Sequence, residues 1–398
     1  MYLDFAKAFD KVNHELLLLK LRRMGIGGKL LRWFSDYLSG RYQRVTVLGE
    51  TSHSLPVLSG VPQGSILGPL LFLVYVNDLP TCVSSTSSVA MFADDTKCYR
   101  RIKSVDDAEA IQLDLNQIAE WCMKWQMDLN KGKCCVLRVT RNANPTLYQY
   151  RLHGQELKSV NKQRDLGVIV TEDLKWTTNV RDVSSKANRM LGYVKRASYD
   201  MREPKSRKIL YLALVRSKLG YCSQVWAPQT VGDILSLERI QRRATKFILS
   251  LPFRAEITYV QRLCRLNLVP LTYWHEYLNL MFLFKHITEK SDPNIVIKIP
   301  TRITRRTFSH SKLIVVPRSK TVSHQNSFYV RSARTWNSLP AYIINCTSVS
   351  QFKSNLLNYY FYLTANIYDP DLPQSFKTVC VKCHRARPIE TIKETLCC

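Results

Sequence analysis

The sequence predicts an α/β domain over residues 1–175, an α-helical domain over residues 176–290, and a basic, partly irregular region over residues 291–398. In the first part, short apolar segments that end in acidic residues alternate with segments of helical periodicity. The pattern is then helical from about residue 179 to 287, after which prolines interrupt the chain. Glycine, proline and charge signals change over residues 172–178, and we place the first boundary there.

The most informative feature of the first domain is the pair Asp94 and Asp95, which follows an apolar stretch that begins at Val89. Apolar residues on both sides of the pair predict a tight strand-turn-strand with the carboxylates at its bend. Two adjacent buried carboxylates are costly unless a positive charge lies between them. A divalent metal is therefore the natural explanation.

A second pair, Asp106 and Asp107, serves as an internal control. Apolar residues recur after it at steps of three and four, which predicts one face of an amphipathic helix. Ser104 followed by Asp107 is typical of a capping box, and acids in a first turn interact favourably with the helix dipole. This pair therefore predicts the start of a helix.

Two further segments accompany the first pair. Residues 2–10 deliver Asp4 at the end of an apolar strand, before a leucine-rich helix over residues 15–24. Residues 59–69 are rich in glycine, which permits close approach of the backbone to a ligand. Pro69 suits the first turn of an apolar helix over residues 70–79.

In this order and spacing, the three segments resemble the A, B and C motifs of reverse transcriptases, in particular those of Jockey-like non-LTR retrotransposons. The matching stretches are LDFAKAFDKVNH, SGVPQGSILGPLLF, MFADD, WCMKWQMDLNKGKC, DLGV, LERIQRRATKFI and TWNSLP. They span nearly the whole chain. The resemblance implies a palm of the right-hand polymerase type over residues 1–175 and a thumb over residues 176–290.

The resemblance also implies the chemistry. Asp4 and Asp94 would hold two Mg²⁺ ions, with Asp95 adjacent and the backbone carbonyl of Phe5 as a further oxygen ligand. Two such ions would assist an in-line displacement that adds deoxynucleotides to a DNA primer on an RNA template.

Four other residues match family positions near the nucleotide. Phe9 falls where the family places a ring against the sugar, although a core aromatic is the alternative. Gln63 and Gly64 would lie over the nascent base pair, or form only a turn before a helix. Lys133 matches the lysine that protonates pyrophosphate, although it could equally be a solvated lysine of a basic protein. Asp10 is expected to cap a helix or to hydrogen-bond locally.

Composition points to a nucleic-acid partner independently of the motifs. The formal net charge is +27, which attracts a phosphate backbone. Residues 186–246 carry fourteen Lys or Arg against four acids, and residues 293–368 contain no acid. Aromatic residues in these regions are expected either to stack on bases or to pack in a core: Tyr211, Tyr221, Trp226, Trp274 and Trp336.

The twelve cysteines are scattered mostly among apolar residues, which is typical of reduced thiols in the nucleus or cytoplasm rather than of secreted disulfides. No apolar run reaches the length of a membrane span, and no signal peptide precedes the first motif. Cys380, Cys383 and His384 suggest a zinc site, but the spacing is incomplete and a cysteine-containing tail is the alternative. The tail after Tyr368 is expected to be poorly ordered.

We expect the chain to be a fragment, because the fingers region that precedes the first motif in the family is missing. Two functions remain open. One is an RNA-directed DNA polymerase of a non-LTR retrotransposon, and the other is a noncatalytic nucleic-acid-binding remnant of such an element. A polymerase of the group II intron or telomerase type would share the palm but not the region with TWNSLP.

Overall fold

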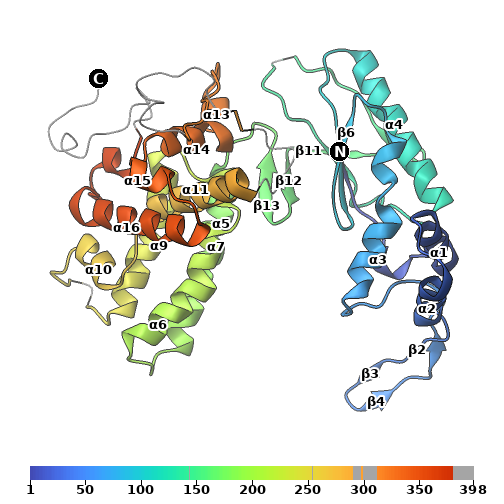
Figure 1. Ribbon diagram of the computed structural model, residues 1–398, viewed down its shortest axis with the longest axis horizontal. Helices are drawn as coiled ribbons and strands as arrows, with labels where there is room; N and C mark the ends of the chain where they lie inside the picture. The colour runs from blue at the N-terminus through green and yellow to red at the C-terminus, as the bar shows by residue number, and fades with distance from the viewer. Residues whose placement is uncertain (143, 253, 290–296, 299–311, 380–398) are drawn as a thin grey trace. The chain divides into compact units, whose positions relative to one another are not determined.

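The computed structural model describes residues 1–142, 144–252, 254–289, 297–298 and 312–379. The chain divides into two compact units, which are coloured blue to green and green to red in Figure 1. The first unit comprises residues 1–163 and 171–173, and the second comprises residues 164–170 and 174–398. Each unit is described by itself.

The first unit is built on a five-stranded sheet with the strand order β11-β8-β1-β7-β6. These strands are β1 (Tyr2–Leu3), β6 (Ser88–Phe92), β7 (Asp95–Tyr99), β8 (Cys135–Leu137) and β11 (Lys158–Val160). β1 pairs antiparallel with both β7 and β8, whereas β11 runs parallel to β8. Because β1 is paired on both sides, the residues that follow it are held in a defined place.

Helices and smaller strand pairs complete the first unit. The helices are α1 (His14–Arg23), α2 (Gly28–Leu38), α3 (Leu67–Val76) and α4 (Val105–Lys124). The strand pairs are β2 (Tyr42–Gln43) with β5 (Leu55–Pro56), β3 (Thr46–Val47) with β4 (Glu50–Thr51), and β9 (Arg151–Leu152) with β10 (Gln155–Glu156). A further pair, β12 (Lys162–Asp165) with β13 (Val168–Thr171), lies where the two units meet in the sequence.

The predicted helices over residues 15–24 and 70–79 are confirmed with shifted bounds. α3 begins three residues earlier than expected, and in its first turn the Gly68 N–H donates a hydrogen bond to the Ser65 hydroxyl at 2.8 Å. Pro69 lies in its first turn, as predicted.

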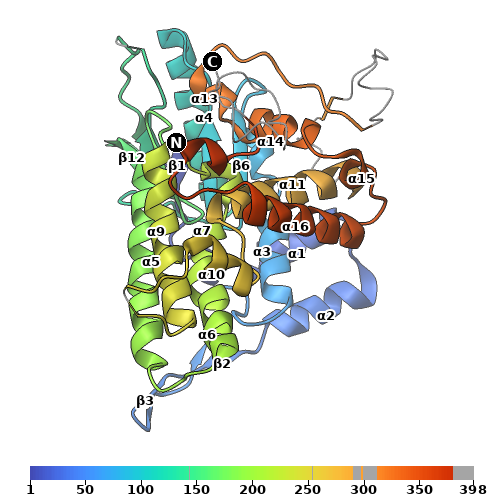
Figure 2. The same cartoon turned by 90° about the vertical axis from the view of Figure 1, so that its left-hand side faces the viewer.

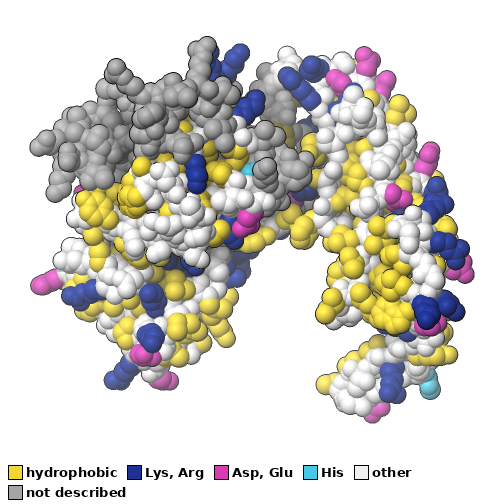
Figure 3. Space-filling model, in the orientation of Figure 1, with side chains coloured by type: hydrophobic (Ala, Val, Ile, Leu, Met, Phe, Trp, Pro, Cys, Tyr) yellow, Lys and Arg dark blue, Asp and Glu magenta, His cyan; other side chains and the backbone are white. Residues whose placement is uncertain are grey.

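One face of α3 remains exposed although the helix is apolar on all sides. Phe72 and Tyr75 are fully buried, but Leu70 and Leu73 are each about half exposed. Hydrophobic side chains gather at this part of the first unit in Figure 3. α3 is therefore buried on one side only.

The second unit is helical. Its longer helices are α5 (Thr177–Ala197), α9 (Val231–Ile248), α11 (Leu271–Glu289), α14 (Phe328–Asn337) and α16 (Val349–Asn366). The shorter ones are α6 (Pro204–Leu210), the π-helix η3 (Tyr211–Arg216), α7 (Ser217–Gly220), α8 (Ser223–Trp226), α10 (Tyr259–Arg265), α13 (Val322–Gln325), α15 (Ala341–Ile344) and the 3-10 helix η4 (Pro373–Phe376). α9 packs against α5, α6 and α10, as Figure 2 shows.

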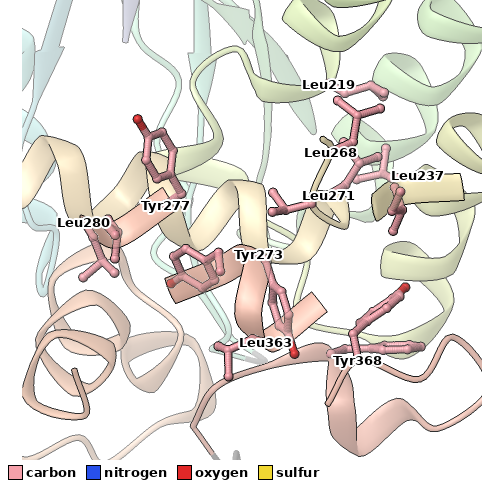
Figure 4. Close-up of a cluster of buried hydrophobic side chains, with 14 of the residues drawn as sticks. Leu219, Leu237, Leu268, Leu271, Tyr273, Tyr277, Leu280, Leu363 and Tyr368 are labelled. Carbon is pink, nitrogen blue, oxygen red and sulfur yellow. The ribbon is translucent and has the colours of Figure 1, made fainter. Parts of the chain in front are cut away.

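The C-terminal region is more regular than the sequence predicts. α14 and α16 pack against α11, and the rings of Phe284 and Phe352 stack with centroids 4.1 Å apart. Buried leucines and tyrosines from these helices belong to the same core as those of α9 (Figure 4). Pro340 directly precedes α15, so this proline lies at the start of a helix.

The segment after Tyr368 is likewise packed as far as residue 379, contrary to the expectation of a poorly ordered tail. The Tyr273 hydroxyl donates to the Ser375 carbonyl at 2.7 Å, and Phe376 is buried. Thus α11 anchors this segment by side-chain hydrogen bonds that a pattern search along the sequence does not reveal. Cys380, Cys383 and His384, the residues of the predicted zinc site, lie outside the described residues.

Candidate active site

Asp4 follows β1 directly and is fixed by the backbone around it. Its carbonyl accepts a hydrogen bond from the Asn130 N–H at 2.7 Å, and its own N–H lies 3.5 Å from the sulfur of Cys134. The side chain is 29% exposed. Its Oδ2 atom is buried without a hydrogen-bond partner. A buried carboxylate oxygen that lacks such a partner is suited to a cation.

Asp94 and Asp95 lie where the sequence predicts them, at the bend of a strand-turn-strand. β6 pairs antiparallel with β7, and Phe92 lies opposite Asp95, so that Ala93 and Asp94 form the two-residue turn. Ala93 has a φ of 52°, a left-handed conformation that costs a residue with a Cβ about 1–2 kcal/mol. Asp94 is half-buried and Asp95 is exposed.

The sheet register brings the two predicted acidic segments together. Leu3 of β1 lies opposite Thr96 of β7. Because the strands are antiparallel, the next positions toward the turn are Asp4 and Asp95. Among the residues that the structure describes, however, no group of three or more His, Cys, Asp or Glu side chains is gathered closely enough to hold a metal ion. The carboxylates thus share one edge without forming a closed ligand set.

Lys133 lies at the same edge. Its Nζ is 3.3 Å from the Asp4 Oδ2 atom, and its side chain is 68% exposed. The turn that carries it is closed by a hydrogen bond from its N–H to the Asn130 carbonyl at 3.0 Å. The ammonium group therefore occupies the kind of position that a cation would take beside Asp4.

The backbone carbonyl of Phe5 is available as a metal ligand. Phe5 forms a single antiparallel bridge with Leu129, in which the hydrogen bonds are made by the neighbouring Asp4 carbonyl and Ala6 N–H. The Phe5 carbonyl takes no part in that bridge. Its side chain is buried in the core of the first unit.

The glycine-rich loop packs on the turn that follows Asp4. A Cβ added at Gly60 would lie 2.9 Å from the Asp10 backbone, so only glycine allows this approach. The exposed Gln63 side chain donates to Asp10 Oδ1 at 2.9 Å. Asp10 therefore accepts a hydrogen bond from a residue 53 positions away, and the expectation of a helix cap or a local hydrogen bond is wrong. Gly64 is exposed with a φ of 83°.

Phe9 stacks on Phe72 of α3 with ring centroids 4.4 Å apart. It is half-buried, so one part of the ring contributes to the core. The Phe9 ring therefore packs on α3, as expected of a core aromatic, and the rest of the ring remains accessible.

The sequence patterns did not predict the residues that hold the glycine-rich loop and the segment before it. The ring of His14 hydrogen-bonds the Gly60 carbonyl through Nε2 at 2.8 Å, and Asn13 caps α1 by accepting the Leu16 N–H at 3.0 Å. Lys11 also forms an ion pair with Asp128. These residues fall inside the KVNH and MDLN stretches, but only their partners reveal their role.

The control pair behaves as the start of a helix. Ser104 is the N-cap of α4 and accepts the Asp107 N–H at 3.4 Å. Asp107 accepts a hydrogen bond from the Lys103 N–H at 3.0 Å and pairs with Arg100 at 3.0 Å. The Lys103 hydrogen bond, followed by the one from Arg100, lowers the pKa of Asp107. Asp106 is exposed.

Base stacking is excluded for three of the five aromatic residues in the second unit, because they are fully buried: Tyr211, Trp226 and Trp336. Trp274 stacks on Tyr277 at 4.9 Å, and the hydroxyl of the exposed Tyr221 donates to the Leu166 carbonyl at 2.9 Å. The cysteines in the described part of the chain are free thiols. Burial raises the pKa of Cys98 to about 11.

Comparison with known proteins relates the N-terminal half of the chain to a polymerase family. Residues 1–195 match the family model of reverse transcriptase (RNA-dependent DNA polymerase), which implies a palm-type polymerase fold.

No helix in the described part of the chain combines the length and apolar character that crossing a bilayer requires.

Three curated relatives illustrate the similarity. The chain is 27% identical over 258 residues to the probable RNA-directed DNA polymerase from transposon X-element of Drosophila melanogaster, covering 62% of the chain and 28% of that protein. It is 26% identical over 266 residues to the RNA-directed DNA polymerase from mobile element jockey of Drosophila funebris, covering 63% and 28%. The Pol polyprotein from the R2 element of Popillia japonica is 28% identical over 142 residues, covering 34% and 23%. The chain thus spans less than a third of each relative.

Proposed function

Since residues 1–195 belong to the reverse transcriptase family, we propose that this chain carries the polymerase centre of a non-LTR retrotransposon and adds deoxynucleotides to a primer 3′ end on an RNA template. The observation that carries the proposal is the pairing of β1 with β7, which places Asp4 beside Asp95 and the turn at Asp94. We assign the palm to residues 1–175, the thumb to residues 176–290, and a basic C-terminal region to residues 291–398.

Asp4, Asp94 and Asp95, with the Phe5 carbonyl, would hold two Mg²⁺ ions. When bound, such ions lower the charge barrier to in-line displacement at a phosphate. In that displacement the primer 3′ oxygen bonds to the α-phosphorus of the nucleotide, its proton leaves, and the bond to pyrophosphate breaks. The Asp4 Oδ2 atom, which has no hydrogen-bond partner, and the Lys133 ammonium beside it support a cation at this edge.

The remaining residues have positioning roles in this proposal. Lys133, 3.3 Å from Asp4, would donate a proton to the departing pyrophosphate. Gln63 and Gly64 would contact the incoming nucleotide, with Gln63 oriented by Asp10. The accessible part of Phe9 would contact the sugar.

The test is primer extension by the full chain on a primed RNA with deoxynucleotides. We expect extension with Mg²⁺, none with a chelator, and a loss of a hundredfold to a thousandfold in Asp4→Asn. Asp36→Asn, an exchange in α2, is the matched control and should extend normally. Absence of extension by the wild-type chain at saturating template would overturn the polymerase proposal and favour the noncatalytic nucleic-acid-binding remnant.

A further inference from the structure

A small polar cavity lies within the second unit, between α11, α14 and residues 373–379, which we call the C-terminal segment. α11 and α14 pack against each other (Figure 1). The Thr272 hydroxyl of α11 donates to the Phe376 carbonyl of the C-terminal segment at 2.5 Å. The cavity measures about 80 Å³. Because a cavity of about 150 Å³ admits benzene, this one suits a smaller ligand.

Positive charge exceeds negative charge in the lining of this cavity. Among the described residues that line it, Arg331, Arg334 and Lys377 are cations and Glu276 is the one carboxylate. His275 adds no charge at neutral pH, because burial lowers its pKa to about 4. Glu276 therefore offsets at most one of the three positive charges.

The Glu276 carboxylate accepts its hydrogen bonds from neutral donors. The Thr378 hydroxyl donates to it at 2.9 Å, and the Tyr360 hydroxyl donates to it at 3.1 Å. The Thr378 N–H donates to its other oxygen at 3.4 Å. Both carboxylate oxygens are thus occupied, and the cations of the cavity remain available to a further anion.

Neutral oxygen atoms hold two of these cations in place. The Lys377 ammonium donates to the side-chain carbonyl of Gln229 at 2.6 Å. The Arg331 guanidinium donates to the carbonyls of Asn326 at 2.9 Å and Ser223 at 3.2 Å. Neutral acceptors orient a cation without cancelling its charge, so an anion in the cavity would gain charge-assisted hydrogen bonds.

Lys377 shows the electrostatic cost of this arrangement. Burial lowers the pKa of its amine to about 8, although the charge of Glu276 opposes the shift. The charge of Arg331 lowers the pKa further. An opposite charge close to a buried ammonium favours its protonated form. An anion in the cavity would therefore raise this pKa, and would bind more tightly when Lys377 is protonated.

We propose that this cavity binds a small tetrahedral oxyanion, inorganic phosphate or sulfate, which bridges α14 and the C-terminal segment. Two negative charges would balance the positive charges that Glu276 leaves in excess. The size of the cavity excludes a nucleotide. By joining Arg334 to Lys377, the anion would stabilise the packing of the C-terminal segment. The inference uses no residue of the first unit and stands independently of the polymerase proposal.

The test is calorimetric titration of the full chain with sodium sulfate at neutral pH, with a chelator and with the ionic strength held constant by chloride. We expect binding in the wild-type chain and at least a tenfold loss of affinity in Lys377→Gln and in Arg334→Gln, because each removes a hydrogen bond to a charged group. Arg334 is only partly buried, so its exchange keeps the test decisive if Lys377→Gln disturbs folding.

Lys353→Gln and Arg239→Gln are the matched controls, since they remove the same two kinds of charge from exposed positions outside the cavity. Both should bind sulfate as the wild-type chain does. No binding by the wild-type chain, or an equal loss in the controls, would overturn the proposal.

The pH dependence of binding gives a second readout. The other charged or titratable groups in the described lining are Glu276 and His275 of α11 and Arg331 and Arg334 of α14. The affinity for sulfate should fall about tenfold as pH rises above 8, where Lys377 loses its proton. Lys377→Gln should abolish this decline, and an equal decline in that variant would contradict the contact with Lys377.

Two further measurements test the size limit and the bridging role. Uridine 5′-monophosphate should bind at least tenfold more weakly than inorganic phosphate, and equal binding would overturn the assignment to a free oxyanion. Sulfate also stabilises proteins in general, because it is excluded from their surface. The rise in melting temperature from chloride to sulfate should therefore be smaller in Arg334→Gln than in the wild-type chain, and an equal rise would refute the bridge.

Discussion

The pairs Asp94-Asp95 and Asp106-Asp107 share a dipeptide and one compact unit, yet they occupy opposite structural settings. The first pair lies at a hairpin turn with a left-handed residue, next to the end of β1. The second pair lies in the first turn of α4, where the Asp107 carboxylate accepts a hydrogen bond from the nearby Lys103 N–H. The flanking pattern, and not the dipeptide, therefore determines whether two carboxylates face a ligand or cap a helix.

The largest expected difference between the pairs is catalytic. Asp94→Asn should reduce primer extension by a hundredfold to a thousandfold, because it removes a charge from the proposed metal-binding edge. Asp106→Asn should leave extension unchanged. Single-turnover extension on a primed RNA measures both variants, and equal losses in the two would end the functional distinction between the pairs.

A second test concerns the cation paired with Asp4 at this edge. Lys133→Gln should slow extension about a hundredfold if this lysine donates a proton to pyrophosphate. Lys131→Gln, an exposed lysine two residues earlier in the same turn, provides the control. If both variants slow extension equally, Lys133 acts only through general positive charge.

The hairpin turn itself can be probed through stability. Ala93→Val places a β-branched residue at a φ of 52°, and we expect the free energy of unfolding to fall by about 1–2 kcal/mol. Ala93→Gly relieves the left-handed strain but adds unfolded-state entropy, so its effect should stay within about 0.5 kcal/mol. Urea denaturation measures both, and equal effects of the two exchanges would show that the turn does not require the left-handed conformation.

The smallest expected effect belongs to the second pair. The folded-state pKa of Asp107 is lowered by the Lys103 and Arg100 contacts, so its stabilisation is present above the usual carboxyl pKa and is lost as pH falls through the lowered value. Asp107→Asn should lower the melting temperature at pH 7 slightly, with the difference disappearing in acid. Asp106→Asn should change it less, and a pH-independent difference for Asp107 would contradict the role of its charge.

Local pattern was sufficient for much of the first unit. The strand-turn-strand at Asp94, the cap at Ser104 and the helix containing Pro69 depend on interactions within a few residues, and all were predicted. The Gln63 to Asp10 hydrogen bond joins residues 53 positions apart, and no local rule predicts it. The C-terminal helices were not predicted, because the prolines of this region indicate breaks in the chain. The apolar spacing that begins at Phe352 in α16 is a weaker signal than these prolines.

The sequence by itself determined the family of residues 1–195, the strand ends that carry Asp4 and Asp94, and the excess of positive charge. Tertiary structure decided how these features are used. It set Lys133 against Asp4, buried Tyr211 and Trp336 in the core, and gathered cations from α9 and three neighbouring helices. Motifs record which chemistry is available, whereas the neighbours of a side chain depend on packing between segments far apart in the chain, and packing decides which charges remain uncompensated and which rings remain accessible.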